Sequence, residues 1–151
     1  MSLNPRDVVI IDGVRTAMGR SKGGMFRNVR AEALSAELIK ALFRRNPAAD
    51  MNEVEDVIWG CVNQTLEQGM NIARVAALGA GLPEVVAGTT VNRFCASGLQ
   101  AIAMAAHQVI NEGASAAFGG GVESITFGQG KMNADGIVSQ KVFDAWPGVY
   151  M

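Results

Sequence analysis

The amino-acid sequence predicts an α/β domain with a layered arrangement and a mostly parallel central sheet. Three observations lead to this fold class. Short apolar runs of strand length alternate with segments of helical periodicity, an order typical of parallel sheets covered by helices. The 151 residues suffice for one domain with a sizeable core, and 49% of them are hydrophobic. The 18 glycines and the abundant alanine allow close packing and are common in such folds, although they do not decide the class alone.

The first predicted strand is Val8–Ile11, a continuous apolar run closed by Asp12-Gly13. Such a run is typical of a strand buried on both faces. Residues 16–30 are rich in glycine, serine and basic side chains, which indicates a loop. The segment AEALSAELIKALFRR predicts an amphipathic helix that Asn46-Pro47 ends. Its apolar stripe comprises Leu34, Leu38 and Leu42, widened by Ala31, Ser35 and Ile39.

The second strand is expected at Val54–Val62, with the sequence VEDVIWGCV. A helix follows from Asn71, whose side chain suits an N-cap, through Ala80. Gly81-Leu82-Pro83 ends it, since glycine and proline both stop helices. The face expected to pack holds Ile72, Val75, Ala76 and Gly79.

The third strand is expected at Thr89–Phe94 and the third helix at Cys95–Asn111, closed by Gly113. The fourth strand is expected at Ala116–Gly120. The third helix is predicted to pack through apolar residues that recur at helical spacing. They are Leu99, Ile102, Ala103, Ala106 and Ile110.

Regular patterning fades after Glu123. We therefore expect one α/β domain over residues 1–124 and the start of an irregular, truncated loop region over residues 125–151. This region ends in large apolar groups, which predicts either a continuation of the chain or a surface that a partner covers. These groups are Phe143, Trp146, Val149, Tyr150 and Met151.

Charge and composition exclude several classes of protein. Lys and Arg number 13 against 14 Asp and Glu, giving a net charge of −1, so no basic nucleic-acid surface is predicted. No apolar run approaches the ~18 residues that a membrane span needs, and a secretory signal pattern is lacking. Cys61 and Cys95 are too few for a disulfide framework. We therefore expect a cytoplasmic protein with no metal site, no membrane span and no nucleic acid as partner.

Cys95 is the candidate nucleophile because it lies where the third predicted strand passes into the third helix. The start of a helix offers unpaired amide N–H groups and the positive end of the helix dipole, which both favour a thiolate. The same amides can stabilise the oxygen that becomes negative when a thiolate attacks a carbonyl. From position alone, the alternative is a small buried side chain with no chemical role.

The run VNRFCASGLQAI, followed by GGGVES, resembles the nucleophile region of the thiolase family of acetyl-CoA acetyltransferases and 3-ketoacyl-CoA thiolases. VVIIDGVRTAMGRSKGGMFRNV and GCVNQTLEQGMNIARVAALGAGLP occur in the family's order, so the resemblance covers nearly the whole chain. It implies the N-terminal half of the thiolase fold. It also implies that an acyl-CoA thioester acylates Cys95, leading to Claisen condensation or, in reverse, thiolytic cleavage of a 3-ketoacyl-CoA.

The resemblance implies that two further catalytic groups lie in a C-terminal half: a histidine that activates the nucleophile and a cysteine that moves the α-carbon proton. His107 lies twelve residues after Cys95 on the same predicted helix, roughly 18 Å along its axis. We expect His107 on the helix surface or in packing, and Cys61 in the core. These 151 residues are therefore expected to hold only half of an active site.

The resemblance further implies coenzyme A thioesters as substrates, no permanently bound cofactor, a place in fatty acid metabolism, and a homo-oligomer, either a dimer or a tetramer. A dimer is expected to form through residues 89–95 and 64–74. Two alternatives stay open: a β-ketoacyl synthase-like condensing enzyme, and a non-catalytic thiolase-like module that binds acyl-CoA or a partner chain.

Overall fold

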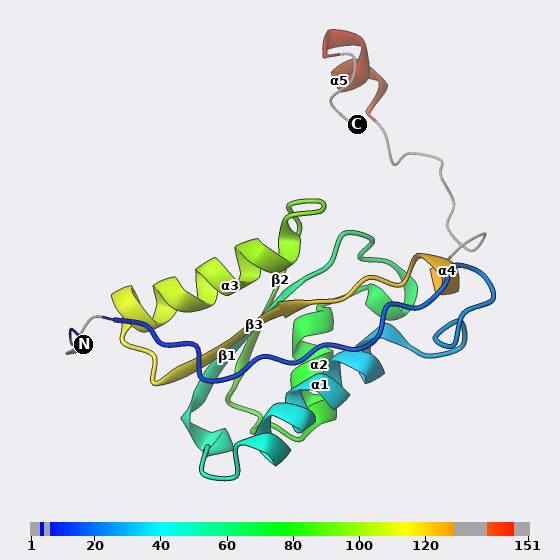
Figure 1. The fold of residues 1–151 in the computed structure, drawn as a ribbon. Helices are drawn as coiled ribbons and strands as arrows, with labels where there is room; N and C mark the ends of the chain where they lie inside the picture. Colours follow the sequence, from blue (N-terminus) through cyan, green and yellow to red (C-terminus); the bar gives the residue numbers. More distant parts are fainter. Residues whose placement is uncertain (1–3, 5–6, 129–138, 147–151) are drawn as a thin grey trace.

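The computed structural model describes residue 4, residues 7–128 and residues 139–146. Within them, three parallel strands form one open sheet in the order β2-β1-β3. The strands are β1 (Val54–Gly60), β2 (Ala87–Val91) and β3 (Ala116–Gly121), and the longer helices are α1 (Ala31–Arg45), α2 (Ile72–Ala80) and α3 (Ser97–His107). Figure 1 shows α3 on one face of the sheet and α1 with α2 on the other. The predicted α/β class, the parallel sheet and the helices on both faces are confirmed.

The described residues also form shorter helical segments. They are η1 (Met51–Glu53), η2 (Leu66–Gln68), η3 (Gln108–Glu112), α4 (Ile125–Gly128) and α5 (Gln140–Ala145). η3 is a π-helical turn that continues α3 as far as Gly113, which has the left-handed φ of 79° that favours glycine. Together α3 and η3 therefore cover most of the helix predicted over Cys95–Asn111.

Helix α1 packs on the sheet through the stripe that the sequence predicts. Ala31, Ser35 and Ile39 are fully buried at its centre, and the three leucines at its margin are half-buried. Ser35 also has a polar role, because its Oγ accepts a 2.9 Å hydrogen bond from the indole Nε1 of Trp59 on β1. This bond satisfies the one polar atom that the buried Trp59 ring brings into the core.

Helix α2 begins and ends as predicted. The Asn71 side chain accepts a 3.2 Å hydrogen bond from Arg74 N, and Gly81 follows the helix with a φ of 87°. The predicted packing face is partly wrong, since Val75 is 44% exposed. Its place in the core is taken by alanines, which let α2 approach α1 and the sheet closely. The buried residues are Ile72, Ala73, Ala76, Ala77 and Ala80.

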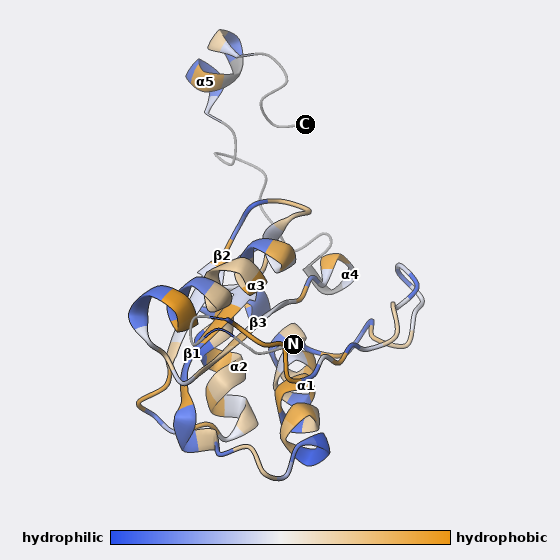
Figure 2. Ribbon diagram, turned by 60° about the vertical axis from the view of Figure 1, so that its left-hand side comes forward, coloured by the Kyte–Doolittle hydropathy of each residue, from blue (hydrophilic) through white to orange (hydrophobic). Residues whose placement is uncertain are grey.

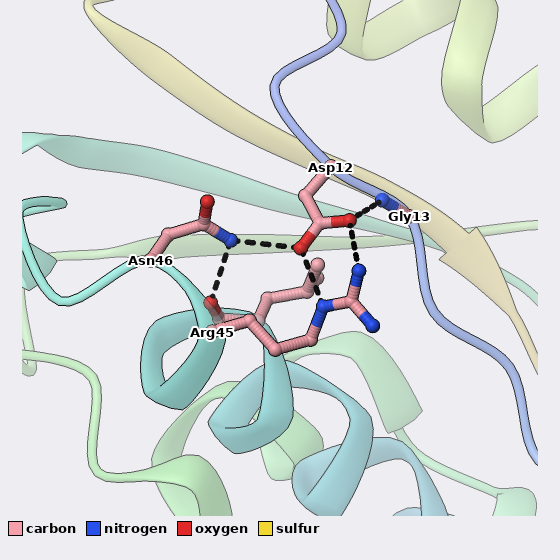
Figure 3. Close-up of polar contacts among 5 residues, drawn as sticks. Asp12, Gly13, Arg45 and Asn46 are labelled. Atoms are coloured by element: carbon pink, nitrogen blue, oxygen red, sulfur yellow. Dashed lines mark hydrogen bonds and ion pairs between the residues drawn. The ribbon is translucent and has the colours of Figure 1, made fainter.

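The strand predicted at Val8–Ile11 is wrong: the segment forms no strand. Ile10 and Ile11 are 82% and 74% exposed, because the described residues supply no hydrogen-bonded neighbour for this run. The segment is held instead by the side chain that follows it. As Figure 3 shows, the Asp12 carboxylate accepts bonds of 2.7 and 3.0 Å from the Arg45 guanidinium and of 2.9 Å from Asn46 Nδ2, both at the end of α1.

The packing face predicted for α3 is also wrong. The small side chains of Ser97, Ala101 and Ala105 face the sheet, whereas Leu99 is 73% exposed and Ile102 and Ile110 are more than 40% exposed. In Figure 2, hydrophobic ribbon segments accordingly occur along α3 as well as along α1 and α2. The reason is steric, since glycines in the sheet let the small face of α3 come closer than leucine would allow.

The described residues contain no helix with the length and apolar character needed to cross a lipid bilayer. In the tail, Trp146 is 65% exposed, while Val149, Tyr150 and Met151 lie outside the described residues. The proposed division between residues 1–124 and 125–151 stays a prediction.

Candidate active site

Cys95 lies in a short turn that joins the carboxyl end of β2 to the start of α3, and it is exposed. β2 ends at Val91, so the strand predicted as far as Phe94 is shorter than expected. α3 begins at Ser97, two residues after Cys95. The predicted position between strand and helix is therefore correct, and a tight turn fills it. The carboxyl edge of a parallel sheet is the usual place for sites in α/β folds.

The turn before Cys95 has an unusual backbone. Phe94 has a φ of 48°, in the left-handed region that side chains other than glycine rarely adopt. The turn is closed by two backbone hydrogen bonds, from Ala96 N to Arg93 O at 3.1 Å and from Ser97 N to Phe94 O at 3.0 Å. Such a conformation persists only where its surroundings fix it, and this is common at functional sites.

The side chain of Ser97 stabilises this turn by two hydrogen bonds to its backbone. Its Oγ accepts a 2.8 Å hydrogen bond from Arg93 N and donates one of 2.6 Å to Phe94 O. Ser97 is only 5% exposed, so its hydroxyl is held within the turn and not directed into solvent. This serine, two residues after Cys95 in the sequence, therefore fixes the backbone of the turn that carries the thiol.

A glycine on the neighbouring strand lets α3 come close to the sheet. A Cβ added to Gly60, at the end of β1, would lie 2.5 Å from Ser97 C and 2.6 Å from Gly98 N. A Cβ at Gly119 on β3 would lie 2.6 Å from Ile102 Cα. Gly98 itself has nothing within 4 Å of an added Cβ. A side chain at Gly60 or at Gly119 would therefore collide with the backbone of α3, and the sequence alone did not indicate either contact.

Cys61 is buried, whereas Cys95 is exposed. It is 1% exposed, as expected for a core residue, and its N–H donates a 3.0 Å hydrogen bond to Val91 O. Burial, and to a lesser extent the negative charges of Glu123 and Glu67, raise the pKa of its thiol to about 12. A thiol with this pKa is inert near neutral pH.

The described residues bring no histidine to Cys95. His107 is exposed and lies at the last residue of α3, at the opposite end of the helix from the thiol. This agrees with the prediction that it does not serve as the base. No group of three or more His, Cys, Asp or Glu side chains in the described part of the chain is arranged to hold a metal ion.

Polar residues directly after the strands also belong to this edge of the sheet, and the sequence analysis assigned them no role. Asn92 follows β2 and donates a 3.2 Å hydrogen bond to Val62 O. Glu123 follows β3 and accepts a 2.8 Å hydrogen bond from Val62 N. For Glu123, the position behind a predicted parallel strand was the available signal, because the carboxyl ends of such strands meet at one edge. Asn92 lay inside the strand predicted at Thr89–Phe94, so it carried no such signal.

Comparison with known proteins agrees with this architecture. The family model described as the thiolase N-terminal domain matches residues 8–146. A 3-ketoacyl-CoA thiolase of Acinetobacter baumannii is 66% identical over 122 residues, which are 81% of this chain and 31% of that protein. A 3-ketoacyl-CoA thiolase of Psychrobacter sp. is 60% identical over the same shares of the two chains.

A solved structure shows the same similarity in three dimensions. The crystal structure of the Bacillus anthracis acetyl-CoA acetyltransferase superposes with a TM-score of 0.65 at 36% identity, over 70% of this chain and 26% of that one. This chain thus spans less than a third of the length of the proteins it resembles. Its sequence match and its fold agree, and the chain belongs to the thiolase family.

Proposed function

We propose that the protein carrying this chain is a thiolase, an acyltransferase whose nucleophile is Cys95. The observation that carries the proposal is the exposed thiol in a braced turn directly before α3, in a chain 66% identical to a 3-ketoacyl-CoA thiolase. Its substrates are coenzyme A thioesters, it binds no permanent cofactor, and it acts in the cytoplasm in fatty acid metabolism. No comparison favours a synthase-like enzyme or a non-catalytic binding module.

The first half-reaction is acyl transfer to Cys95. The Cys95 Sγ attacks the thioester carbonyl carbon of acyl-CoA, and the carbonyl oxygen becomes negative. Amide N–H groups at the start of α3 are suited to stabilise this oxygen. The C–S bond to coenzyme A then breaks, the coenzyme A thiolate takes up a proton, and the acyl group stays on Cys95 as a thioester.

The second half-reaction uses the acylated Cys95 as the electrophile. The α-carbon of a second acyl-CoA loses a proton and forms a C–C bond to the acyl carbon, which releases the Cys95 thiolate and a 3-ketoacyl-CoA. The reverse sequence is thiolysis. The histidine and second cysteine that family resemblance implies for proton transfer are not supplied by His107 or Cys61, because one is remote and the other buried.

The proposed enzyme is a homo-oligomer, a dimer or tetramer, that forms through residues 89–95 and 64–74. Two features support this surface. β2 is an edge strand whose outer side has no neighbour within the described residues. Three large apolar residues with left-handed backbone also lie exposed here: Leu66, Met70 and Phe94, at 50%, 97% and 62%. Sedimentation of a monomer alone at high concentration would contradict this.

Acyl transfer tests the proposal directly. The purified protein is incubated with acetyl-CoA and digested, and the peptides are mapped by mass spectrometry. The expected result is one acetyl group on Cys95, released by hydroxylamine as a thioester would be, and none in the Cys95→Ala variant. Acetylation of Cys61 instead, or an unchanged yield in Cys95→Ala, would contradict the assignment.

A further inference from the structure

The exposed carboxylate of Glu123 accepts four hydrogen bonds. It lies two residues after β3, and its Oε2 accepts bonds from Val62 N at 2.8 Å and from Asn63 N at 3.3 Å. Its Oε1 accepts bonds from Asn63 Nδ2 at 3.1 Å and from Gln68 Nε2 at 3.0 Å. Hydrogen bonds to a charged acceptor are stronger than those between neutral groups. The carboxylate therefore fixes the loop that follows β1.

The side chain of Gln68 also forms hydrogen bonds to this loop. This side chain is 2% exposed, and its Nε2 also donates a 2.8 Å hydrogen bond to Asn63 O. Its Oε1 accepts a hydrogen bond from Ser124 N, next to Glu123. The end of β3 and the loop after β1 are thereby joined through a buried amide as well as through the carboxylate.

The loop after β1 is connected in turn to the turn that carries Cys95. Val62 O accepts a 3.2 Å hydrogen bond from Asn92 Nδ2, and Asn92 Oδ1 accepts one of 3.0 Å from Phe94 N. Phe94 is the residue directly before Cys95 and has the strained backbone described above. A continuous set of hydrogen bonds therefore runs from Glu123 through Val62 and Asn92 to Phe94.

From this connection we infer that Glu123 is a positioning residue for the Cys95 nucleophile. It holds Val62, whose carbonyl orients Asn92, and Asn92 fixes the amide of the strained Phe94. The inference rests on the proposed role of Cys95 as nucleophile. A direct effect of charge would have the opposite sign, because removing a nearby negative charge favours a thiolate. A loss of Cys95 reactivity without Glu123 therefore reports on position.

The test measures the rate at which iodoacetamide alkylates Cys95 at pH 7 in the purified chain, by peptide mass mapping. In Glu123→Ala we expect the rate to fall about three- to tenfold, the range that one net hydrogen bond represents. Glu123→Gln keeps one acceptor oxygen and should recover part of the rate. Glu84→Ala, which removes an exposed carboxylate between α2 and β2, is the matched control and should react like the wild type. Thermal unfolding of each variant shows that it is folded during the assay.

A second variant, Asn92→Ala, removes the hydrogen bonds at the Phe94 end of the same set. Asn92→Ala should lower the Cys95 rate by a similar factor, and the double variant should lose little more than either single one, because both changes break one connected set. A Glu123→Ala or Asn92→Ala rate equal to that of the wild type would overturn the inference, as would a Gln variant no faster than the Ala variant. If Glu123→Ala does not fold, the Asn92→Ala rate decides. Wild-type Cys95 no faster than glutathione would instead contradict the proposed function.

Discussion

On one face of the sheet, α1 and α2 bury large side chains of β1 and of their own, whereas on the other face α3 buries little. The first face holds a core that includes Ile39, Val57, Trp59, Ile72 and Val86. The buried hydrophobic residues of the second face are Ile58, Ala101 and Ala105. Apolar burial contributes about 25 cal/mol per Å², so most of the stability of the described residues comes from the first face.

The small contact between α3 and the sheet buries little apolar surface, but it positions the turn that carries Cys95. Small side chains on the helix and glycines on β1 and β3 bring its backbone onto the sheet, and this places the turn with Cys95 at the sheet edge. The two faces of the sheet therefore have different roles: the α1 and α2 face provides most of the stability, and the α3 face positions Cys95. Substitutions under α1 should lower stability, and substitutions under α3 should affect the reactivity of Cys95 more than stability.

The largest expected effect is on the α1 face. Ile39 is fully buried and packs in the larger core. Ile39→Ala should lower the free energy of unfolding by about 2–5 kcal/mol, because it removes buried methylenes and leaves a cavity. Urea unfolding followed by circular dichroism measures this loss. A loss under 1 kcal/mol would contradict the assignment of stability to this face.

A smaller effect is expected where α3 contacts β1. Gly60→Ala would place a Cβ 2.5 Å from Ser97 C, so backbone must move, at about 1–3 kcal/mol. The alkylation rate of Cys95 should fall as the start of α3 shifts. Gly98→Ala is the matched control, because nothing lies within 4 Å of its added Cβ, and it should leave the rate unchanged. Equal rates in the two variants would show that the close contact does not position Cys95.

The N-terminal segment is tied to the α1 side by a pH-dependent contact. Hydrogen bonds from Arg45, then Asn46, then the Gly13 amide lower the pKa of Asp12 from 3.8 to about 2. Because the folded value is the lower one, the contact stabilises fully above pH 3.8 and is lost as pH falls through about 2. An NMR titration of the Asp12 carboxyl should show this midpoint, and Arg45→Gln should move it toward 3.8. A wild-type midpoint near 3.8 would mean that the segment is detached.

The smallest effect is expected on the outer side of α3. Leu99 is 73% exposed, so Leu99→Ala should change the free energy of unfolding by less than about 0.5 kcal/mol. The same urea assay used for Ile39→Ala gives the value. A loss above 2 kcal/mol would show that this side of α3 is covered in solution, and the contrast between the two faces would then be wrong.

Local signals predicted the order and ends of most elements. The cap at Asn71, the left-handed Gly81 and the stop at Asn46-Pro47 act on the residues beside them, so they are visible in the sequence. The strand-to-helix position of Cys95 was predicted for the same reason. The resemblance of the residues around it to thiolases then indicated the chemistry.

Features that depend on distant residues were not predicted. Val8–Ile11 has the composition of a strand, but a strand also needs a neighbour, and composition does not show whether one is present. The inward face of α3 depends on Gly60 and Gly119, which belong to other strands. The contact of Glu123 with Val62 spans 61 residues of sequence, so no local pattern reveals it.

The reactivities of Cys95 and Cys61 can be compared within one sample. The native chain receives a short pulse of iodoacetamide at pH 7, is then denatured, and is labelled with an isotopically distinct iodoacetamide before peptide mapping. We expect Cys95 to carry the first label, at a rate above that of glutathione, and the buried Cys61 to carry only the second. A first label on Cys61, or a Cys95 no faster than glutathione, would contradict the assignment of Cys95 as the nucleophile.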